Sequence, residues 1–237
     1  MPLNERIIFA LDVDSHESAV RWIDHLESHI RFYKVGLQLF LADWFHTVDE
    51  ITRRGHKVMV DLKFFDIPET VRLAVRQLKH RGVTFATVHG NNPILEAAAG
   101  EKDGLKILAV TVLTSFGVED MKEMFGAPVD IKKLVLSRAR RALQLNCDGV
   151  VSSGLEAKEL RRDLGQNFLV VTPGIRPGVN REEPMDDQKR IVTAGEAIAN
   201  GADHVVVGRP ISNAADPIAV VEMMQSEIER ALLRGGP

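Results

Sequence analysis

The stretch Asp61-Leu62-Lys63-Phe64-Phe65-Asp66-Ile67-Pro68 follows an apolar run, Val58-Met59-Val60, that predicts the core of a buried strand. Side chains alternate between the two faces of a strand, so Asp61 and Lys63 are expected to point the same way. Pro68 suits the first turn of a following helix, which places a second carboxylate in the connection. A carboxylate, an ammonium and another carboxylate therefore collect at the carboxyl end of one strand.

Charges on one face of a buried strand cost free energy unless they have further partners or a function. The spacing alone supports two interpretations equally well. One is a structural salt bridge at a strand end and the other is part of a catalytic site, since structural ion-pair networks also occur in proteins.

Strand-like runs rich in Val, Ile and Leu alternate with amphipathic segments along the whole chain, without a linker between them. We expect strands at 6–12, 32–36, through Asp61 and Lys63, and at 83–89, 106–113, 149–153, 168–172 and 204–208. We expect helices at 18–30, 39–54, 69–81, 94–101, 131–145, 156–164, 190–200 and 219–233. Strands of this composition flanked by helices indicate a parallel sheet covered on both faces.

Eight such units predict a (β/α)8 barrel, or TIM barrel, that occupies residues 1–237 as a single domain. Barrels of this class commonly form one domain at about this chain length. The alternative is an open doubly wound sheet. That fold would be expected to carry a glycine-rich turn after an early strand, and Asp12-Val13-Asp14-Ser15 is not such a turn.

The composition is typical of a soluble globular protein, with 45% hydrophobic and 27% charged residues in a chain of 237. The 30 basic and 33 acidic residues are interspersed and give a net charge of −3, unlike the basic face of a nucleic-acid-binding protein. Aromatic residues make up 5% of the chain, too few for a base-stacking platform. We therefore expect no nucleic-acid partner.

Cys147 is the only cysteine, so neither an intrachain disulfide nor a cysteine-based zinc site can form. The histidines are scattered, with no pair at metal-ligand spacing. No apolar run approaches membrane-spanning length, and the first residues lack the apolar core of a signal peptide. We therefore expect a cytoplasmic protein with no metal site and no membrane partner.

In a (β/α)8 barrel the active site lies at the carboxyl ends of the strands. Polar residues of this chain are expected there, namely Asp12, Lys34, Asp61, Lys63, Thr114, Ser115, Arg176 and Arg209. The loops after the seventh and eighth strands, where such barrels often bind phosphate, carry Gly174-Ile175-Arg176-Pro177-Gly178 and Gly208-Arg209-Pro210. Either arginine alone is more simply a surface residue. Both together, each beside glycine, predict a phosphorylated substrate.

Residues 177–189 form the longest polar stretch between expected elements. Long loops in compact domains are often lids, and a lid that closes over phosphate would place Gln188 on the ligand. Composition alone favours a plain exposed loop.

The motif at 61–68 resembles the signature of the orotidine 5'-phosphate decarboxylase family, in its stand-alone bacterial form. The resemblance continues in family order through Ala10-Leu11-Asp12, Lys34-Val35-Gly36, Leu113-Thr114-Ser115, Thr172-Pro173-Gly174-Ile175-Arg176, Asp187-Gln188 and Val207-Gly208-Arg209. The Asp-x-Lys-x-x-Asp pattern is shared with sugar-phosphate relatives, whereas the full set of motifs is much more specific.

This resemblance implies loss of CO2 from orotidine 5'-monophosphate to give uridine 5'-monophosphate (UMP), the last step of de novo UMP biosynthesis, without metal or organic cofactor. It implies that Lys63 delivers a proton to C6 of the pyrimidine. The implied network of alternating charges consists of Lys34, Asp61, Lys63 and Asp66 of the partner subunit. In the implied homodimer, Asp66 and Thr70 each reach into the partner's site.

The other implied roles concern the substrate. Asp12 and Lys34 would hold the ribose, and Thr114 with Ser115 would meet the pyrimidine ring. The residues implied to hold the phosphate are Arg176, Gln188, Gly208 and Arg209, with Gln188 on the lid.

Two other functions stay open. A 3-keto-gulonate 6-phosphate decarboxylase or a hexulose 6-phosphate synthase would use a metal and an enediolate, and would need further acidic ligands that are not obvious at the strand ends. A non-catalytic nucleotide-binding barrel would have no need of Lys63 and both aspartates, so their presence argues against it.

Overall fold

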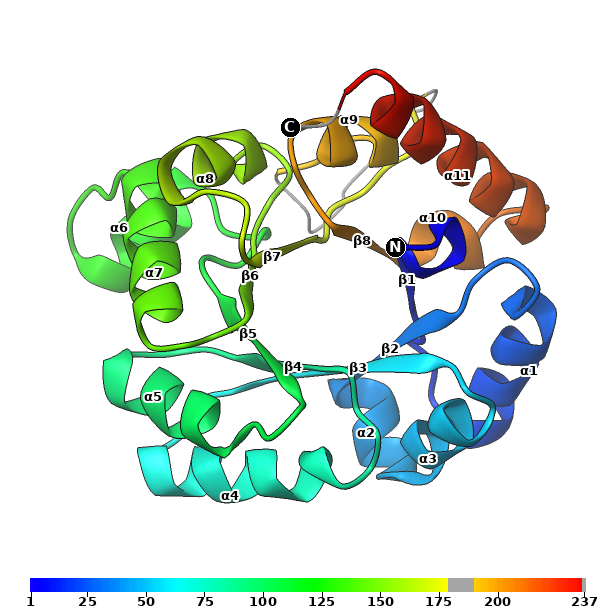
Figure 1. Cartoon of the computed structure of the whole chain (residues 1–237), viewed down its shortest axis with the longest axis horizontal. Coiled ribbons are helices and arrows are strands. Elements are labelled where there is room, and N and C mark those ends of the chain that lie inside the picture. Colours follow the sequence, from blue (N-terminus) through cyan, green and yellow to red (C-terminus); the bar gives the residue numbers. More distant parts are fainter. Residues whose placement is uncertain (179–189, 236–237) are drawn as a thin grey trace.

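The computed structural model describes residues 1–178 and 190–235, and in them eight parallel strands form a closed barrel (Figure 1). Each strand pairs with the next, and β8 pairs with β1 to close the sheet. The strands are β1 (Ile7–Ala10), β2 (Phe32–Gly36), β3 (Lys57–Phe64), β4 (Phe85–Val88), β5 (Lys106–Val110), β6 (Gly149–Val151), β7 (Leu169–Thr172) and β8 (His204–Val207). The predicted (β/α)8 fold is confirmed, and the open doubly wound sheet is wrong.

Helices surround the barrel on its outer side (Figure 1). In the described residues they are η1 (Leu3–Glu5, 3-10), α1 (His16–Leu26), α2 (Leu37–Asp43), α3 (His46–Arg53), α4 (Pro68–Lys79), α5 (Asn92–Glu101), α6 (Val118–Phe125), α7 (Ile131–Gln144), α8 (Ala157–Leu164), α9 (Ala194–Ala199), α10 (Arg209–Ser212) and α11 (Pro217–Leu233). Several begin at a side chain that accepts a backbone N–H, including Ser15, Asn91, Asp130 and Asp216. Within 1–178 and 190–235, none is both long and apolar enough to cross a membrane.

Two apolar layers form the core, one on each side of the sheet, because strand side chains alternate between its faces. The inner layer fills the barrel with Ile8, Ala10, Phe32, Met59, Phe85, Leu108, Val110, Val151, Val171 and Val206. The outer layer lies between sheet and helices and includes Val60 of β3, Ile23 of α1 and Val75 of α4. The inner face of β3 carries Met59, Asp61 and Lys63 in succession. The polar side chains therefore begin directly above the last apolar residue of the inner core.

The helices differ from expectation in four places. Residues 39–54 form two helices, α2 and α3, and Trp44 between them adopts a left-handed backbone with φ of 51°. The helix expected at 190–200 covers only Ala194–Ala199, which begins at a capping box made by Thr193 and Glu196. Both α6 and α10 are short helices within strand-to-helix connections, where hydrophobic periodicity carries little information.

A buried histidine lies at the amino ends of the strands, opposite the polar rim. His204 is 3% exposed, and its ring packs edge-on against Phe32 and Phe85, with centroid distances of 5.4 and 5.3 Å. Its Nδ1 lies 2.9 Å from the carbonyl oxygen of Glu5, so the neutral ring donates a hydrogen bond there. Burial lowers the pKa of His204 to about 4, although the hydrogen bond to Glu5 opposes the shift.

We expect His204 to make the protein less stable in acid. The unfolded chain takes up a proton near the ordinary pKa of 6.5, while the folded ring stays neutral down to about pH 4, so the free energy of unfolding falls as the pH drops through this window. Between about pH 7.5 and pH 5 this group alone accounts for a loss of about 2 kcal/mol. Urea unfolding at both pH values provides the measurement. A His204→Phe variant should lose less stability on acidification than the unmodified protein, and equal losses would contradict the assignment.

Candidate active site

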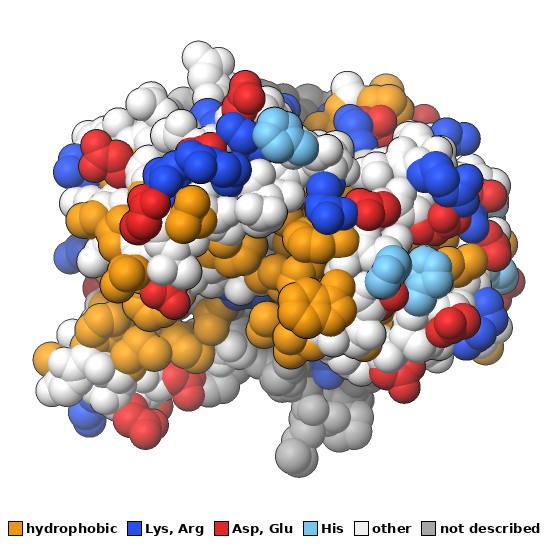
Figure 2. Space-filling model, turned by 90° about the horizontal axis from the view of Figure 1, so that it is seen from below, with side chains coloured by type: hydrophobic (Ala, Val, Ile, Leu, Met, Phe, Trp, Pro, Cys, Tyr) orange, Lys and Arg blue, Asp and Glu red, His pale blue; other side chains and the backbone are white. Residues whose placement is uncertain are grey.

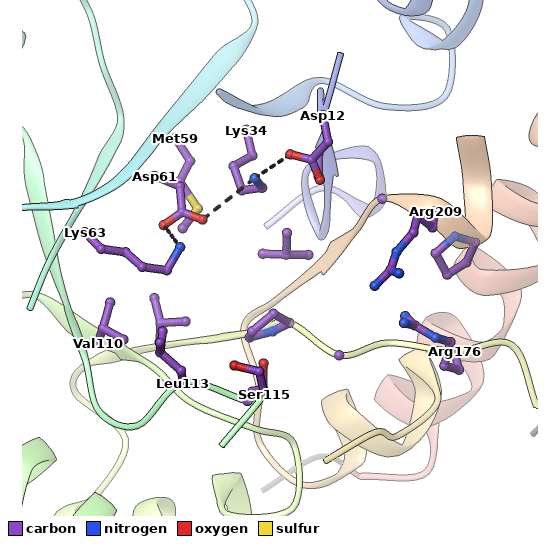
Figure 3. A pocket seen from close by; sticks show the side chains of 18 of the residues that line it. Asp12, Lys34, Met59, Asp61, Lys63, Val110, Leu113, Ser115, Arg176 and Arg209 are labelled. Carbon is purple, nitrogen blue, oxygen red and sulfur yellow. Dashed lines mark hydrogen bonds and ion pairs between the residues drawn. The ribbon is translucent and has the colours of Figure 1, made fainter. Parts of the chain in front are cut away.

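A cavity of about 440 Å³ opens at the carboxyl ends of the strands. This volume is in the range of pockets that bind small organic ligands. Nine of the predicted site residues line it, namely Asp12, Lys34, Asp61, Lys63, Thr114, Ser115, Arg176, Gly208 and Arg209. The acidic residues and lysines lie along one wall, and the two arginines lie at the other end (Figure 3).

Four charged side chains form a row of alternating sign along that wall (Figure 3). The Nζ of Lys63 donates a hydrogen bond to Asp61 Oδ1 at 3.0 Å, and the Nζ of Lys34 lies 3.8 Å from Asp61 Oδ2. The Nζ of Lys34 also donates to Asp12 Oδ1 at 3.0 Å. The row therefore runs from Asp12 through Lys34 and Asp61 to Lys63, and two lysines balance two aspartates.

Asp61 is the central carboxylate of this row, with a side chain that is 13% exposed. Burial by itself would raise the pKa of Asp61, but the charges of Lys34 and Lys63, together with hydrogen bonds from Lys63 and Thr87, bring its pKa below the usual value. Asp61 is therefore ionised at neutral pH, despite its enclosure.

Thr87 on β4 supports the end of β3, although no sequence motif points to it. The register between these strands shifts between Val60 and Phe64, and Lys63 adopts a φ of 48° there. A non-glycine residue in this left-handed region is strained, and such strain is concentrated at functional sites. The Thr87 hydroxyl accepts a hydrogen bond from the Lys63 N–H at 3.0 Å and donates one to Asp61 Oδ1 at 2.8 Å. It thus holds both residues in place.

Gly36 leaves room for the ammonium group of Lys34. A Cβ atom at this position would lie 3.0 Å from Lys34 Nζ and 3.5 Å from Asp12 Oδ1. Any larger residue would therefore press on the ion pair between Lys34 and Asp12. Within the Lys34-Val35-Gly36 run, the glycine lets the ammonium group lie close to the backbone without displacement.

The loops after β7 and β8 form the opposite end of the cavity. The guanidinium groups of Arg176 and Arg209 both point into it (Figure 3). Arg176 Nη1 donates a hydrogen bond to the carbonyl oxygen of Ile175 at 2.7 Å. At Gly208 a Cβ atom would lie 3.3 Å from Asp12 Oδ2, so the glycine permits this loop to approach the end of β1. Two guanidinium groups at one end of a cavity suit a phosphate.

The loop after β5 forms a third wall. Thr114 is buried, Ser115 is partly exposed, and both line the cavity together with Leu113. Hydroxyl groups beside an apolar side chain can contact both the edge and the face of a polar ring. The resemblance assigns Thr114 and Ser115 to the pyrimidine ring, and this role stays a prediction.

Asp66 and Thr70 do not line this cavity. Both are exposed, and Asp66 lies between Phe65 and Ile67, which are 69% and 67% exposed. Asp66 Oδ1 accepts a hydrogen bond from the Ile67 N–H at 2.6 Å. Gln188 lies outside the described residues. Its contact with phosphate and the roles of Asp66 and Thr70 across a subunit interface stay predictions.

Known proteins resemble this chain over nearly its whole length. Residues 5–224 match the model of the Orotidine 5'-phosphate decarboxylase / HUMPS family. An orotidine 5'-phosphate decarboxylase of Methylococcus capsulatus is 52% identical over 236 residues, covering 99% of this chain and 96% of the relative. A protein of the same name from Xanthomonas axonopodis pv. citri is 46% identical over 239 residues, covering 98% and 96%.

Solved structures agree with these relatives. The crystal structure of orotidine 5'-phosphate decarboxylase from Lactobacillus acidophilus superposes with a TM-score of 0.81 and 34% identity, covering 94% of this chain and 99% of that chain. The matched residues include every strand of the barrel and every described residue that lines the cavity. The resemblance inferred from the motifs is confirmed, and this chain belongs to the orotidine 5'-phosphate decarboxylase / HUMPS family.

Proposed function

We propose that this protein converts orotidine 5'-monophosphate to UMP and CO2, as the last step of UMP biosynthesis. The observation that carries the proposal is the row of alternating charges that ends on Lys63, in one cavity with the paired guanidinium groups of Arg176 and Arg209. The names of the relatives support the same reaction. We place it in the cytoplasm, which suits a chain whose one cysteine is a buried free thiol.

The proposed reaction breaks the bond between C6 and the carboxylate carbon, and its electron pair stays on C6 while CO2 leaves. The ring has no carbonyl adjacent to C6 that could delocalise this pair well. A positive charge held in advance beside C6 is therefore the main means of stabilising the transition state. Lys63 provides that charge and then donates a proton from Nζ to C6, which forms UMP; the lysine regains a proton from water.

Asp61 acts on both Lys63 and the substrate. Its ionised carboxylate holds the Lys63 ammonium at 3.0 Å, with Thr87 fixing the carboxylate from the other strand. The same negative charge faces the carboxylate of the bound substrate, and the repulsion between the two falls when CO2 leaves as a neutral molecule.

Most of the binding energy is expected from the phosphate end. The row of two aspartates and two lysines has no net charge, so it does not simply attract a substrate carboxylate. Arg176 and Arg209 instead offer charge-assisted hydrogen bonds to the phosphate, far from the atoms that react. Binding energy from this remote group can be used to bring the carboxylate against Asp61.

We also propose a homodimer in which Asp66 and Thr70 complete the partner's site. Large apolar side chains are exposed on or beside α2 and α4, namely Leu37, Leu41, Trp44, Phe65, Ile67 and Leu73. Figure 2, which views the molecule from the side of these helices, shows hydrophobic side chains gathered on this face. An apolar surface of this kind supports burial against a second copy, which would carry Asp66 across the interface.

The sugar-phosphate branch of the family is the second candidate. Its enediolate chemistry uses a metal ion bound by acidic side chains. In residues 1–178 and 190–235, no three His, Cys, Asp or Glu side chains are grouped so that they could hold a metal ion.

Ultraviolet absorbance of orotidine 5'-monophosphate tests the proposal on the purified protein. We expect turnover that EDTA leaves unchanged. Orotidine, which lacks the phosphate, should react with a kcat/KM at least about a thousandfold lower, because two charge-assisted contacts are lost. Absence of turnover with orotidine 5'-monophosphate, or metal-dependent turnover of a hexulose 6-phosphate, would assign the protein elsewhere in the family.

A further inference from the structure

Arg190 is a buried arginine outside the cavity, and it connects the loop after β5, which lines the cavity, to Glu156 in the loop after β6. The Arg190 side chain is 10% exposed. Nη1 donates to Glu156 Oε1 at 2.5 Å, while Nη2 donates to the carbonyl oxygens of Val112 and Leu113 at 3.0 and 3.1 Å. One guanidinium group thus joins the loop after β5 to Glu156, which directly precedes α8.

Glu156 orients this guanidinium group. Its side chain is 5% exposed, and Ser152 Oγ donates to Glu156 Oε2 at 3.5 Å. Stability is a weak explanation for the pair, because apolar side chains of similar volume usually stabilise a core as well as a buried ion pair does. The ion pair instead fixes the orientation of the guanidinium group of Arg190. This planar group can reach the carboxylate and both carbonyl oxygens only in one orientation.

The two carbonyl groups held by Arg190 lie directly before Thr114. They follow the last residue of β5 and so lie beyond the regular strand. The carbonyl oxygen of Thr111 is held in the same way, by Arg138 Nη1 at 2.6 Å. Three successive carbonyl groups therefore depend on arginine side chains, and the wall that carries Thr114 and Ser115 takes its position from them.

We propose that Arg190 is a positioning residue for the pyrimidine end of the site. It holds the backbone at Val112 and Leu113 so that Thr114 and Ser115 are in place before the substrate arrives. Without Arg190, the loop would have to become ordered when the pyrimidine ring binds, and the free-energy cost of this ordering would weaken binding of the ring. Binding of the phosphate would be unaffected. This inference rests on the proposed function, because it takes the loop after β5 as the wall that meets the pyrimidine.

Ligands that occupy different parts of the cavity test the inference. UMP occupies the whole cavity, while ribose 5-phosphate occupies the phosphate and ribose positions and leaves the pyrimidine end empty. Removing Arg190 alone would leave Glu156 buried without a partner, so the informative variant is Arg190→Met combined with Glu156→Leu. We expect its Kd for UMP, measured by calorimetry, to rise about tenfold, the effect of one lost charge-assisted hydrogen bond, with the Kd for ribose 5-phosphate unchanged.

A second buried arginine provides the matched control. Arg161, 5% exposed at the side chain, pairs with Asp203 at 2.7 Å and donates to the carbonyl oxygens of Gly201 and Phe168 at 2.8 and 2.7 Å. These groups lie before β8 and β7, at the opposite end of the barrel. Arg161→Met combined with Asp203→Asn should lower the unfolding temperature but leave the Kd for UMP unchanged.

The possible outcomes separate this inference from the function on which it rests. An unmodified protein that binds no UMP would overturn the proposed function. If the unmodified protein and the Arg190 variant have equal Kd values for UMP, Arg190 has only a structural role. If the Kd values for UMP and for ribose 5-phosphate rise by the same factor, Arg190 acts at the phosphate end of the cavity. Loss of UMP affinity in the Arg161 control as well would attribute the effect to general destabilisation.

Discussion

Replacing Lys63 with alanine is expected to reduce kcat/KM for orotidine 5'-monophosphate by at least about 10⁴-fold, because the variant loses both the charge that stabilises the C6 anion and the group that protonates it. Each of these contributions is commonly worth a factor of about a hundred or more. The loss of ultraviolet absorbance of the substrate measures the effect directly.

The fold should survive this substitution. The Lys63 side chain is 37% exposed, and Asp61 keeps its contacts with Lys34 and Thr87 when the ammonium is removed. Lys57 begins the same strand at the opposite end of the barrel, where its Nζ pairs with Glu5, so Lys57→Ala is a matched control that should keep full activity. Undiminished turnover by a folded Lys63→Ala variant would falsify the assignment of the proton donor.

Mixing two inactive variants is expected to restore activity if the site is shared between subunits. A Lys63→Ala protomer still offers Asp66 to its partner, and an Asp66→Asn protomer still carries Lys63. A hybrid dimer therefore contains one intact site. With equal amounts and random exchange, half of the dimers are hybrids with one intact site of two, so about a quarter of the unmodified activity should return.

A second mixture shows whether any recovery reflects a shared site. Asp61 and Lys63 lie on the same strand of the same protomer, so Lys63→Ala mixed with Asp61→Asn should regain nothing. Native mass spectrometry can establish that subunits have exchanged. If hybrids form and the first mixture stays inactive, Asp66 does not act across the interface.

The rim of the barrel could be predicted closely because the signals that define it are local. The period of two along β3 places Asp61 and Lys63 on one face, and their hydrogen bond confirms this even though the strand register shifts between Val60 and Phe64. The same logic predicts that Arg176 and Arg209 share a cavity, since the carboxyl ends of parallel strands meet at one rim.

The supporting residues could not be found in this way. Thr87 belongs to an ordinary strand, and only the shifted register of β3 brings its hydroxyl between the Lys63 N–H and Asp61, 26 residues away from the carboxylate. Arg190 is 78 residues from Val112 and precedes a helix that begins later than its pattern suggests. Side-chain periodicity carries no information about which distant carbonyl group a guanidinium will reach.

The amino-acid sequence by itself determined that strands and helices alternate around a barrel. It also determined that charged and glycine-containing motifs lie at the carboxyl ends of the strands. Both could be predicted because hydrophobic period and strand direction are properties of short segments. Only the tertiary structure decided that Lys34 bridges Asp12 and Asp61, that Thr87 secures a strained lysine, and that Arg190 holds the wall beside Thr114. Those contacts join segments that are distant in the chain, and they depend on strand register and on side-chain conformation, which exist only once the barrel has closed.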